Sequence, residues 1–282
     1  MKALVIGNGE SRAWFKPCHQ TIMDDEVITW GCNAIYREGR HCVHNLVAMD
    51  YAMQQEIYDS GWCDENPEFG DIHNVYFANW EVVPAEIADG MLMGFDIPES
   101  FIHKSKNKTG HCVIGGKDPV TLSEKIESAI QQFPNLDMED LKLKMSKDVG
   151  VWITYVNEIR DVVVPIKGLT GFSTGNAALS LACQSGAREI YMLGFDLSSY
   201  DKLLNNLYKG TSNYLPADAK GFNPVNWIGQ MSEIFDKHKN KTFYWVDCKL
   251  SGNSWHGASI DNYHTNIRYL ERKKFCEELK II

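Results

Sequence analysis

The 282-residue sequence lacks several features, and each absence narrows the class of protein. No apolar run approaches the roughly 18–20 residues of a membrane span. The apolar stretch at the N-terminus is too short for a secretory signal, so we expect a cytoplasmic protein, in the host cytoplasm if the chain is viral. None of the eight cysteines forms a C-x-x-C pair, which argues against zinc and favours reduced thiols. The net charge of −9 argues against broad nonspecific binding to nucleic acid.

Familiar phosphate- and metal-binding signatures are also missing. The first apolar segment is followed by Gly7-Asn-Gly-Glu-Ser-Arg12, which lacks the third glycine of G-x-G-x-x-G and is not a P-loop. No D-x-D pair follows a predicted strand, so we expect no metal site and no cofactor. A nucleotide leaving group would then be neutralised by hydrogen-bond donors.

What the chain does contain is an alternation of apolar segments, polar corners and helical segments. This pattern predicts an α/β, Rossmann-like fold, in which a mostly parallel sheet has helices on both faces. The expected strands are Lys2–Ile6, Glu26–Trp30, Asn45–Met49, Asn74–Phe77, Glu189–Leu193 and Thr242–Val246. The expected helices include Tyr51–Tyr58, Asn176–Ser185, Asn226–Lys237 and the amphipathic Thr265–Leu279.

Residues 84–165 are less regular than the segments on either side. They contain one clear helical segment, Thr121–Gln132, and strand candidates at Val149–Val156 and Val162–Val164. We therefore expect one Rossmann-like domain over residues 1–282, with residues 84–165 forming an insertion or lid.

The segment from Gly171 to Asp196 is the most informative in the chain. Ser173, Thr174 and Gly175 precede a buried helix, where free N–H groups and the positive end of the helix dipole favour a phosphate. Asp196 follows the apolar run Ile190–Leu193, and so lies at the carboxyl end of a strand, where open α/β sheets hold their ligands.

The carboxyl ends of the first three predicted strands carry polar residues too. Asn33 follows the second strand and Asp50 the third, where an acid commonly binds a ribose hydroxyl, although either could be an Asx turn or helix cap. A glycine turn after the first strand is also explained by packing alone. The agreement of these corners predicts a nucleotide pocket lined by Gly7, Asn8, Gly9, Ser11, Arg12, Asn33 and Ser173–Gly175.

Further residues are candidates for charge neutralisation and proton transfer. Tyr200, Tyr208 and Lys209 follow Asp196 in a polar segment and could donate to a leaving phosphate. Candidate catalytic bases are Asp50, Asp196 and His256.

Several motifs resemble those of the bacterial lipooligosaccharide sialyltransferases. These are Gly7-Asn-Gly-Glu-Ser11, Cys32-Asn-Ala-Ile-Tyr36 and the small-residue helix that runs into Glu189-Ile-Tyr-Met-Leu-Gly-Phe-Asp196. The resemblance implies a single Rossmann-like domain with a lid that binds CMP-sialic acid without a metal. It also implies that Asn8, Gly9, Ser11, Asn33 and Ser173–Gly175 line the nucleotide pocket.

The chain departs from that family at two places. Asp50 stands where the family has an asparagine, and Gly221–Trp227 holds no histidine where the family has its catalytic one. Asp50 and Gly194–Asp196 also resemble the hydroxymethylpterin diphosphokinase-like family. Asn206–Thr211 and Asn226–Ile228 resemble segments of bacteriophage proteins.

These observations predict a metal-independent, nucleotide-sugar-dependent glycosyltransferase that acts on a glycan or a modified nucleic-acid base. Two alternatives stay open: a diphosphokinase-like transferase acting on a small heterocycle, and a nonenzymatic nucleotide-binding module. Fold alone does not choose among them. The lack of a metal pair counts against the diphosphokinase-like transferase, because phosphoryl transfer normally needs Mg²⁺.

Overall fold

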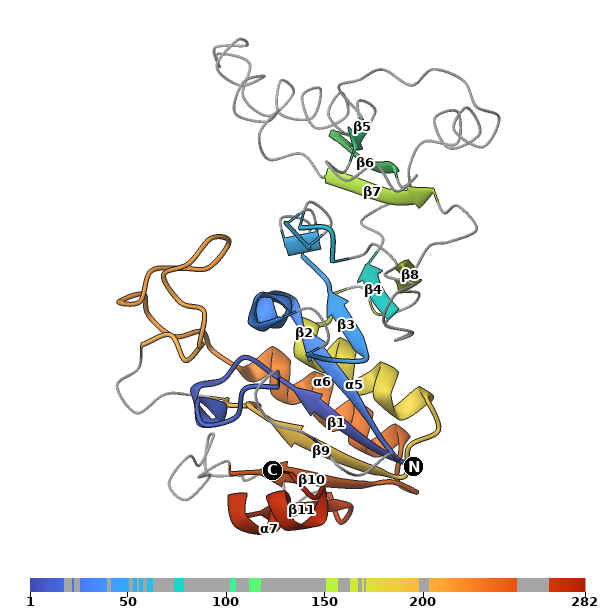
Figure 1. Cartoon of the computed structure of the whole chain (residues 1–282), viewed down its shortest axis with the longest axis vertical. Helices are drawn as coiled ribbons and strands as arrows, with labels where there is room; N and C mark the ends of the chain where they lie inside the picture. Colours follow the sequence, from blue (N-terminus) through green and yellow to red (C-terminus); the bar gives the residue numbers. More distant parts are fainter. Residues whose placement is uncertain are drawn as a thin grey trace, which may run out of the picture.

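A computed structural model describes most of the predicted nucleotide-binding region (Figure 1). The described residues are 1–17, 22, 26–39, 42–50, 53–54, 56–57, 60–62, 74–78, 102–104, 112–117, 151–156, 163–166, 169, 171–197, 203–247 and 264–281. Within them, no helix is both long and apolar enough to cross a bilayer.

The described strands form one large sheet and one small one. The large sheet has eight strands in the order β11-β10-β9-β1-β2-β3-β4-β8, and every neighbouring pair is parallel. Its strands are β1 (Lys2–Ile6), β2 (Val27–Cys32), β3 (Asn45–Ala48), β4 (Asn74–Ala78), β8 (Val163–Ile166), β9 (Glu189–Leu193), β10 (Thr242–Val246) and β11 (Ile267–Leu270). The small sheet is antiparallel and contains β5 (Ile102–Lys104), β6 (Cys112–Lys117) and β7 (Val151–Val156).

Both faces of the large sheet are covered, as the apolar strands require. Successive residues of β1 point to opposite faces: Ala3 and Val5 belong to one buried cluster, and Leu4 and Ile6 to the other. The helices α5 (Thr174–Gln184) and α6 (Val225–Lys237) pack on the first face. The other face is covered by the 3₁₀ helices η1 (Glu10–Arg12) and η2 (Asn33–Glu38), a helical segment within residues 53–57, and α7 (Arg272–Glu278).

The strand order places a topological switch point between β1 and β9. From β1 the chain moves outward through β2, β3 and β4, and it then returns through α5 to pair β9 with the opposite edge of β1. The chain therefore continues from β1 and from β9 toward opposite edges of the sheet, and doubly wound sheets bind ligands at such a switch point. The α/β Rossmann-like fold predicted from the sequence is confirmed.

The C-terminal segment differs from its prediction. Instead of one helix over Thr265–Leu279, it forms β11 followed by α7. The buried residues of this strand, Ile267 and Leu270, are three positions apart, a spacing that also fits a helix. Backbone pairing with β10 gives the segment an extended conformation instead.

Described strands also lie in the interval 84–165, which was predicted as an insertion or lid. The predicted strand Val162–Val164 is present as β8, and its residues Val163 and Val164 pair with β4 at the edge of the large sheet. The predicted strand Val149–Val156 is present as β7, whereas β5 and β6 were not expected. The predicted helix Thr121–Gln132 lies outside the described residues.

Candidate functional site

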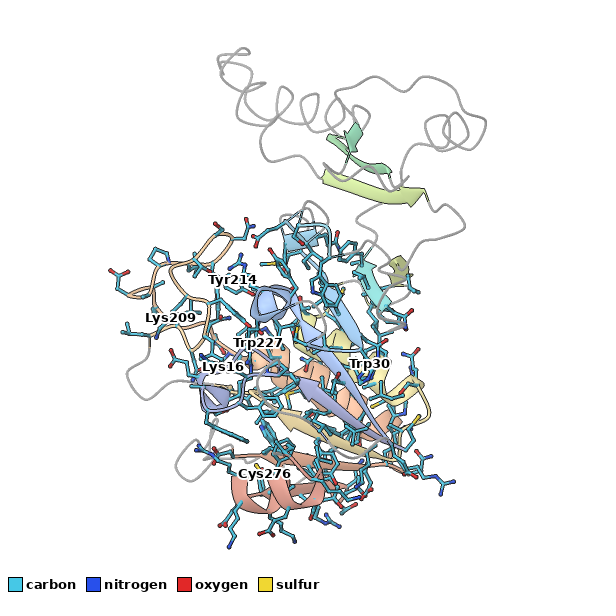
Figure 2. The ribbon with its side chains drawn as sticks, viewed as in Figure 1. Lys16, Trp30, Lys209, Tyr214, Trp227 and Cys276 are labelled. Atoms are coloured by element: carbon cyan, nitrogen blue, oxygen red, sulfur yellow. The ribbon has the colours of Figure 1, made fainter. Side chains whose placement is uncertain are left out.

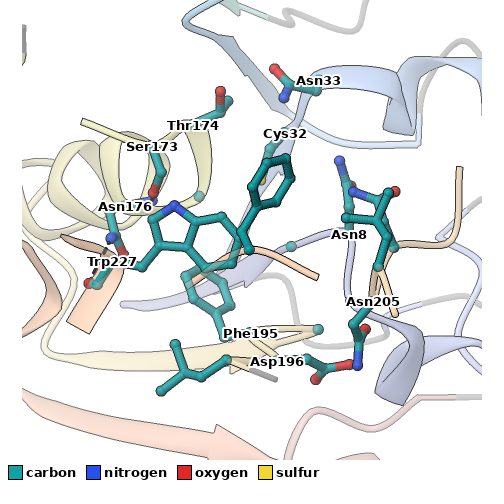
Figure 3. A pocket seen from close by; sticks show the side chains of 18 of the residues that line it. Asn8, Cys32, Asn33, Ser173, Thr174, Asn176, Phe195, Asp196, Asn205 and Trp227 are labelled. Carbon is teal, nitrogen blue, oxygen red and sulfur yellow. Dashed lines mark hydrogen bonds between the residues drawn. The ribbon is translucent and has the colours of Figure 1, made fainter. Parts of the chain in front are cut away.

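A pocket of about 510 Å³ opens at the carboxyl ends of β1, β2, β3 and β9, at the switch point. Figure 3 shows Ser173, Thr174 and Asn176 of α5 on one side of it and Asn8, Asn205 and Asp196 on the other. Its polar and charged lining residues are Asn8, Asn33, Asp50, Ser173, Thr174, Asn176, Asp196, Asn205, Asn206, Asn213 and Tyr214. Its larger apolar lining residues are Phe172, Phe195, Leu197, Leu204, Leu215, Phe222, Trp227 and Met231.

Three glycines allow the loops after β1 and β9 to touch through their backbones. A Cβ at Gly7 would lie 2.5 Å from the Gly194 oxygen, and one at Gly194, which has φ +71°, would lie 2.8 Å from the Gly7 oxygen. The Gly9 amide donates to the Gly194 oxygen at 2.9 Å. These glycines are thus required by packing between the loops, and their backbones form the floor of the pocket.

The start of α5 is a preformed donor site. Ser173 is the N-cap, and its hydroxyl accepts from the Asn176 amide at 3.4 Å, as the sequence predicts for a helix that begins here. Gln230 of α6 accepts from the Ser173 amide at 2.9 Å and from the Asn176 side chain at 3.1 Å, which fixes this turn. The amides of Thr174 and Gly175, at the first two helical positions, have no intrahelical acceptor and border the pocket.

Tyr214 lines the same pocket as the start of α5. Its hydroxyl oxygen accepts from Asn8 Nδ2 at 3.1 Å and from the Ala34 amide at 3.4 Å. Burial raises the pKa of the Tyr214 hydroxyl, so it stays protonated. With both acceptor positions filled, its own hydrogen is free to be donated to a ligand in the pocket.

Asn33 and Asp50 meet at the ends of β2 and β3. Asn33 has a left-handed φ of 49°, which is uncommon outside glycine and directs its side chain from the first residue of η2. Burial by the pocket walls raises the pKa of Asp50, and a hydrogen bond from Asn33 partly offsets this effect. Asn33 Oδ1 is buried and has no hydrogen-bond partner among the described residues.

Asp196 is held differently from Asp50. Its Oδ2 accepts from the Ser11 amide at 2.8 Å, and Figure 3 shows its carboxylate directed toward Asn205. Burial raises the pKa of Asp196, opposed by the hydrogen bonds from Ser11 and Asn205. The side chain therefore joins the loops after β1 and β9, although it also borders the pocket.

The charged residues among the described lining of the pocket are all acidic. Among the described lining residues Asp50 and Asp196 are acidic, and none is lysine, arginine or histidine. The described residues also contain no group of three or more His, Cys, Asp or Glu arranged around a metal position. An anion bound here would thus rely on backbone N–H groups and on neutral donors such as Tyr214.

Some predicted ligand contacts do not reach the pocket. Arg12 is fully buried: Nε donates to the Gly7 oxygen at 2.5 Å, and Nη2 donates to Glu38 and Tyr208 at 2.9 Å each. Arg12 and Tyr208 therefore stabilise the loop after β1 instead of facing a phosphate. The polar groups of Arg12 and Tyr208 are hydrogen-bonded inside the protein, because a buried polar group without a partner is unfavourable.

The other predicted contacts divide into three groups. Ser11 contributes its amide to Asp196, and Lys209 forms an ion pair with Glu10 at 2.6 Å; neither lines the pocket. Figure 2 shows Lys209 and Tyr214 in the same segment, with Tyr214 beside η2. Tyr200 and His256 lie outside the described residues. The pocket does bring together the predicted Gly7, Asn8, Gly9, Asn33, Asp50, Ser173, Thr174, Gly175 and Asp196.

Sequence reasoning missed Tyr214, Asn205 and Trp227, which line the pocket from beyond β9. Asn205 and Tyr214 lie between Leu203 and Gly221, where the sequence has no periodicity to place a side chain. Trp227 lies in the first turn of α6, a helix that the sequence predicts. Its position near the start of that helix was the feature that could have indicated a place in the pocket.

Comparisons with known proteins give a distant structural likeness. No family model matches the chain, and no curated protein matches its sequence. The monofunctional α-2,3-sialyltransferase Cst-I of Campylobacter jejuni is 12% identical with a TM-score of 0.43, over 93% of this chain and 78% of that one. An asparagine-to-alanine variant of the sialyltransferase CST-II in complex with CMP is 12% identical with a TM-score of 0.41, over 94% of this chain and 85% of that one.

A third structure is CstII from Campylobacter jejuni in complex with the substrate analogue CMP-3FNeuAc. It is 12% identical with a TM-score of 0.33, over 89% of this chain and 83% of that one. All three are sialyltransferases; none is a bacteriophage protein or a diphosphokinase. A likeness of this extent does not define a function, which has to come from the pocket itself.

Proposed function

We propose that the chain is a nucleotide-sugar-dependent glycosyltransferase that works without a metal. The observation that carries the proposal is the lining of one pocket by two kinds of neutral donor. Thr174 and Gly175 have amides without an intrahelical acceptor, and Tyr214 has a hydroxyl hydrogen that its two acceptor contacts leave available. Together they supply donors to a phosphate without a cationic side chain or metal.

The acidic lining favours a ligand with little negative charge. A diphosphate would bring more negative charge close to Asp50 and Asp196, with no cationic side chain among the described lining residues to neutralise it. A sugar linked to a nucleoside through a single phosphate, as in a CMP-sugar, fits this lining better. Asn8 and Asn33 offer acceptor oxygens for the hydroxyl and amino groups of its nucleoside.

Asp50 is the described carboxylate best suited to act as base. Unlike Asp196, it is exposed, and among the described residues no backbone amide is seen to donate to its carboxylate. In the reaction an acceptor hydroxyl attacks the anomeric carbon and gives its proton to Asp50. The bond from that carbon to the phosphate oxygen breaks, and its electron pair stays on the phosphate, which Thr174, Gly175 and Tyr214 stabilise. Glycans and modified nucleic-acid bases are both acceptors of this kind.

The same lining disfavours a diphosphokinase. Transfer of a pyrophosphate from ATP requires several negative charges to be neutralised, normally by Mg²⁺ and a cationic side chain. The described lining residues include neither a lysine nor an arginine.

Two measurements test the proposal in sequence. A thermal-shift panel with CMP, UDP, GDP and ATP identifies the nucleotide, because ligand binding raises the unfolding temperature. We expect CMP to stabilise the protein most. Release of the nucleotide from sugar nucleotides in EDTA then tests catalysis. Loss of turnover in EDTA would contradict metal independence, and the absence of any nucleotide-induced shift would contradict the proposed function.

A further inference from the structure

The segment Leu203–Asn223, here called the strap, forms one wall of the pocket without regular secondary structure of its own. It contributes Leu204, Asn205, Asn206, Asn213, Tyr214, Leu215 and Phe222 to the lining. Apart from an isolated bridge between Leu203 and Lys220, it forms no strand or helix. Its position over the pocket therefore depends on contacts with the elements beneath it.

The strap's first half is anchored in the protein interior. The Leu207 amide donates to the Asn8 oxygen at 2.8 Å, and the Tyr208 hydroxyl lies in the buried cluster with Arg12 and Glu38. These contacts hold the strap as far as Tyr208 but do not reach the turn that follows.

The turn from Lys209 to Leu215 is compact but exposed. The Gly210 amide donates to the Leu215 oxygen at 2.8 Å, and the Tyr214 amide donates to the Thr211 oxygen at 3.1 Å. These bonds close the turn on itself, and they do not attach it to the sheet.

Glu56 attaches the turn from outside the pocket, in addition to the contacts of Tyr214 with Asn8 and Ala34 and the ion pair of Lys209 with Glu10. It belongs to the helical segment after β3, and its carboxylate accepts from the Tyr36 hydroxyl, from Arg37 Nε at 2.7 Å and from Asn213 Nδ2 at 2.6 Å. Arg37 in turn donates to Thr211 Oγ1 at 2.7 Å and to the Ser212 oxygen at 2.9 Å. One carboxylate thus joins η2, the segment after β3 and the turn of the strap.

The connection from Glu56 continues into the pocket. Asn213 has a left-handed φ of 61°, a conformation that asparagine tolerates but that needs support from its surroundings. It directly precedes Tyr214, whose hydroxyl meets Asn8 and Ala34. A fixed Asn213 side chain therefore also fixes the backbone position of Tyr214.

We propose that Glu56 is a positioning residue, which holds Asn213 and Tyr214 against the pocket and thereby sets its affinity for a ligand. Burial alone would raise the pKa of Glu56, but the hydrogen bonds from Tyr36, Arg37 and Asn213 lower it overall. The carboxylate is therefore charged while it holds the strap. The choice of a nucleotide as probe rests on the proposed function, whereas the holding of the strap does not.

Hydrogen exchange on the ligand-free full chain tests the attachment. The variants are Glu56→Gln and Glu56→Ala, and the matched control is Glu10→Gln. Glu10 also forms an ion pair with the strap, through Lys209, but lies outside the pocket lining. We expect the amides of Gly210, Thr211 and Tyr214 to exchange about tenfold faster in the Glu56 variants, with α5 unchanged and the control within about twofold of the wild type. Unchanged exchange at these amides in both Glu56 variants would overturn the proposal.

Calorimetry with CMP tests the consequence for binding. We expect both Glu56 variants to bind CMP about tenfold more weakly, which corresponds to about 1.4 kcal/mol. Because Glu56 acts through Asn213, Asn213→Ala should weaken binding similarly, and the double variant little further. Faster exchange with unaltered CMP affinity, or fully additive effects, would overturn the positioning role. If CMP does not bind the wild type, the proposed function is wrong. The hydrogen-exchange experiment alone then tests whether Glu56 holds the strap.

Discussion

The carboxylate of Asp196 occupies the space that a side chain on residue 9 would need. A Cβ at Gly9 would lie 2.5 Å from Asp196 Cγ and 2.7 Å from the Gly194 oxygen. Asp196 also accepts from the Ser11 amide at 2.8 Å. The loops after β1 and β9 are thus joined by backbone contact and by one carboxylate, which gives the pocket a fixed floor at the switch point.

The first prediction concerns this contact. Gly9→Ala should destabilise the protein by about 1–3 kcal/mol. The new methyl group would clash with the Gly194 backbone and with the Asp196 carboxylate, which its hydrogen bond to Ser11 holds in place. Gly229→Ala in α6 is the control: nothing lies within 4 Å of its Cβ, so it should gain about 0.5–1 kcal/mol from helix propensity. Urea denaturation measures both. Equal stability of the two variants would contradict the packing explanation of Gly9.

The second prediction concerns Arg12. Its side chain is fully buried and forms a 2.9 Å ion pair with Glu38. Arg12→Met should cost about 3–5 kcal/mol, because it leaves the Glu38 carboxylate without its cation. Glu38→Gln added to Arg12→Met should recover part of this loss by removing the stranded charge. If the double variant is less stable than Arg12→Met, uncompensated charge is not the cause.

The third prediction concerns the base. Asp50→Asn should lower kcat by about 10²–10⁴-fold while CMP binding survives, because the amide cannot accept the proton. Burial raises the pKa of Asp50 above 3.8, and only its deprotonated form accepts a proton. Wild-type kcat should therefore fall as the pH decreases through that raised pKa.

Asp196→Asn and His256→Ala complete the comparison of candidate bases. Asp196→Asn should chiefly lower stability, because the side chain supports the Ser11 amide. His256 remains a candidate outside the described residues. If all three variants turn over normally, none of them is the base.

The sequence contained enough information for the strands of the large sheet other than β11 and for most of the pocket floor. Strands such as Lys2–Ile6 and Glu189–Leu193 are continuous apolar runs buried on both faces, so their limits are clear. The carboxyl ends of parallel strands lie at a common edge, so the sequence alone predicts that Asn8, Asn33 and Asp50 lie close together. Ser173 marked the start of α5 through its capping preference.

The positions of the remaining site residues depend on tertiary contacts. Arg12 looks like a phosphate ligand beside a glycine loop, yet its partners Glu38 and Tyr208 are distant in sequence and draw it into the interior. Tyr214 lies in an irregular segment, and its place in the pocket depends on Asn8 and Ala34. Such long-range pairings leave no periodic signal in a single sequence.

The most direct measurement is the affinity for CMP of two variants at the first helical position of α5. Thr174→Pro removes the backbone N–H proposed to bind the phosphate, while proline fits this helical position and the extended Ser173 before it. Thr174→Val keeps the N–H and the side-chain shape. Calorimetry in EDTA should show Thr174→Val within about twofold of the wild type and Thr174→Pro at least about tenfold weaker, the loss of one charge-assisted hydrogen bond. Equal affinities of the two variants would contradict a phosphate at the start of α5.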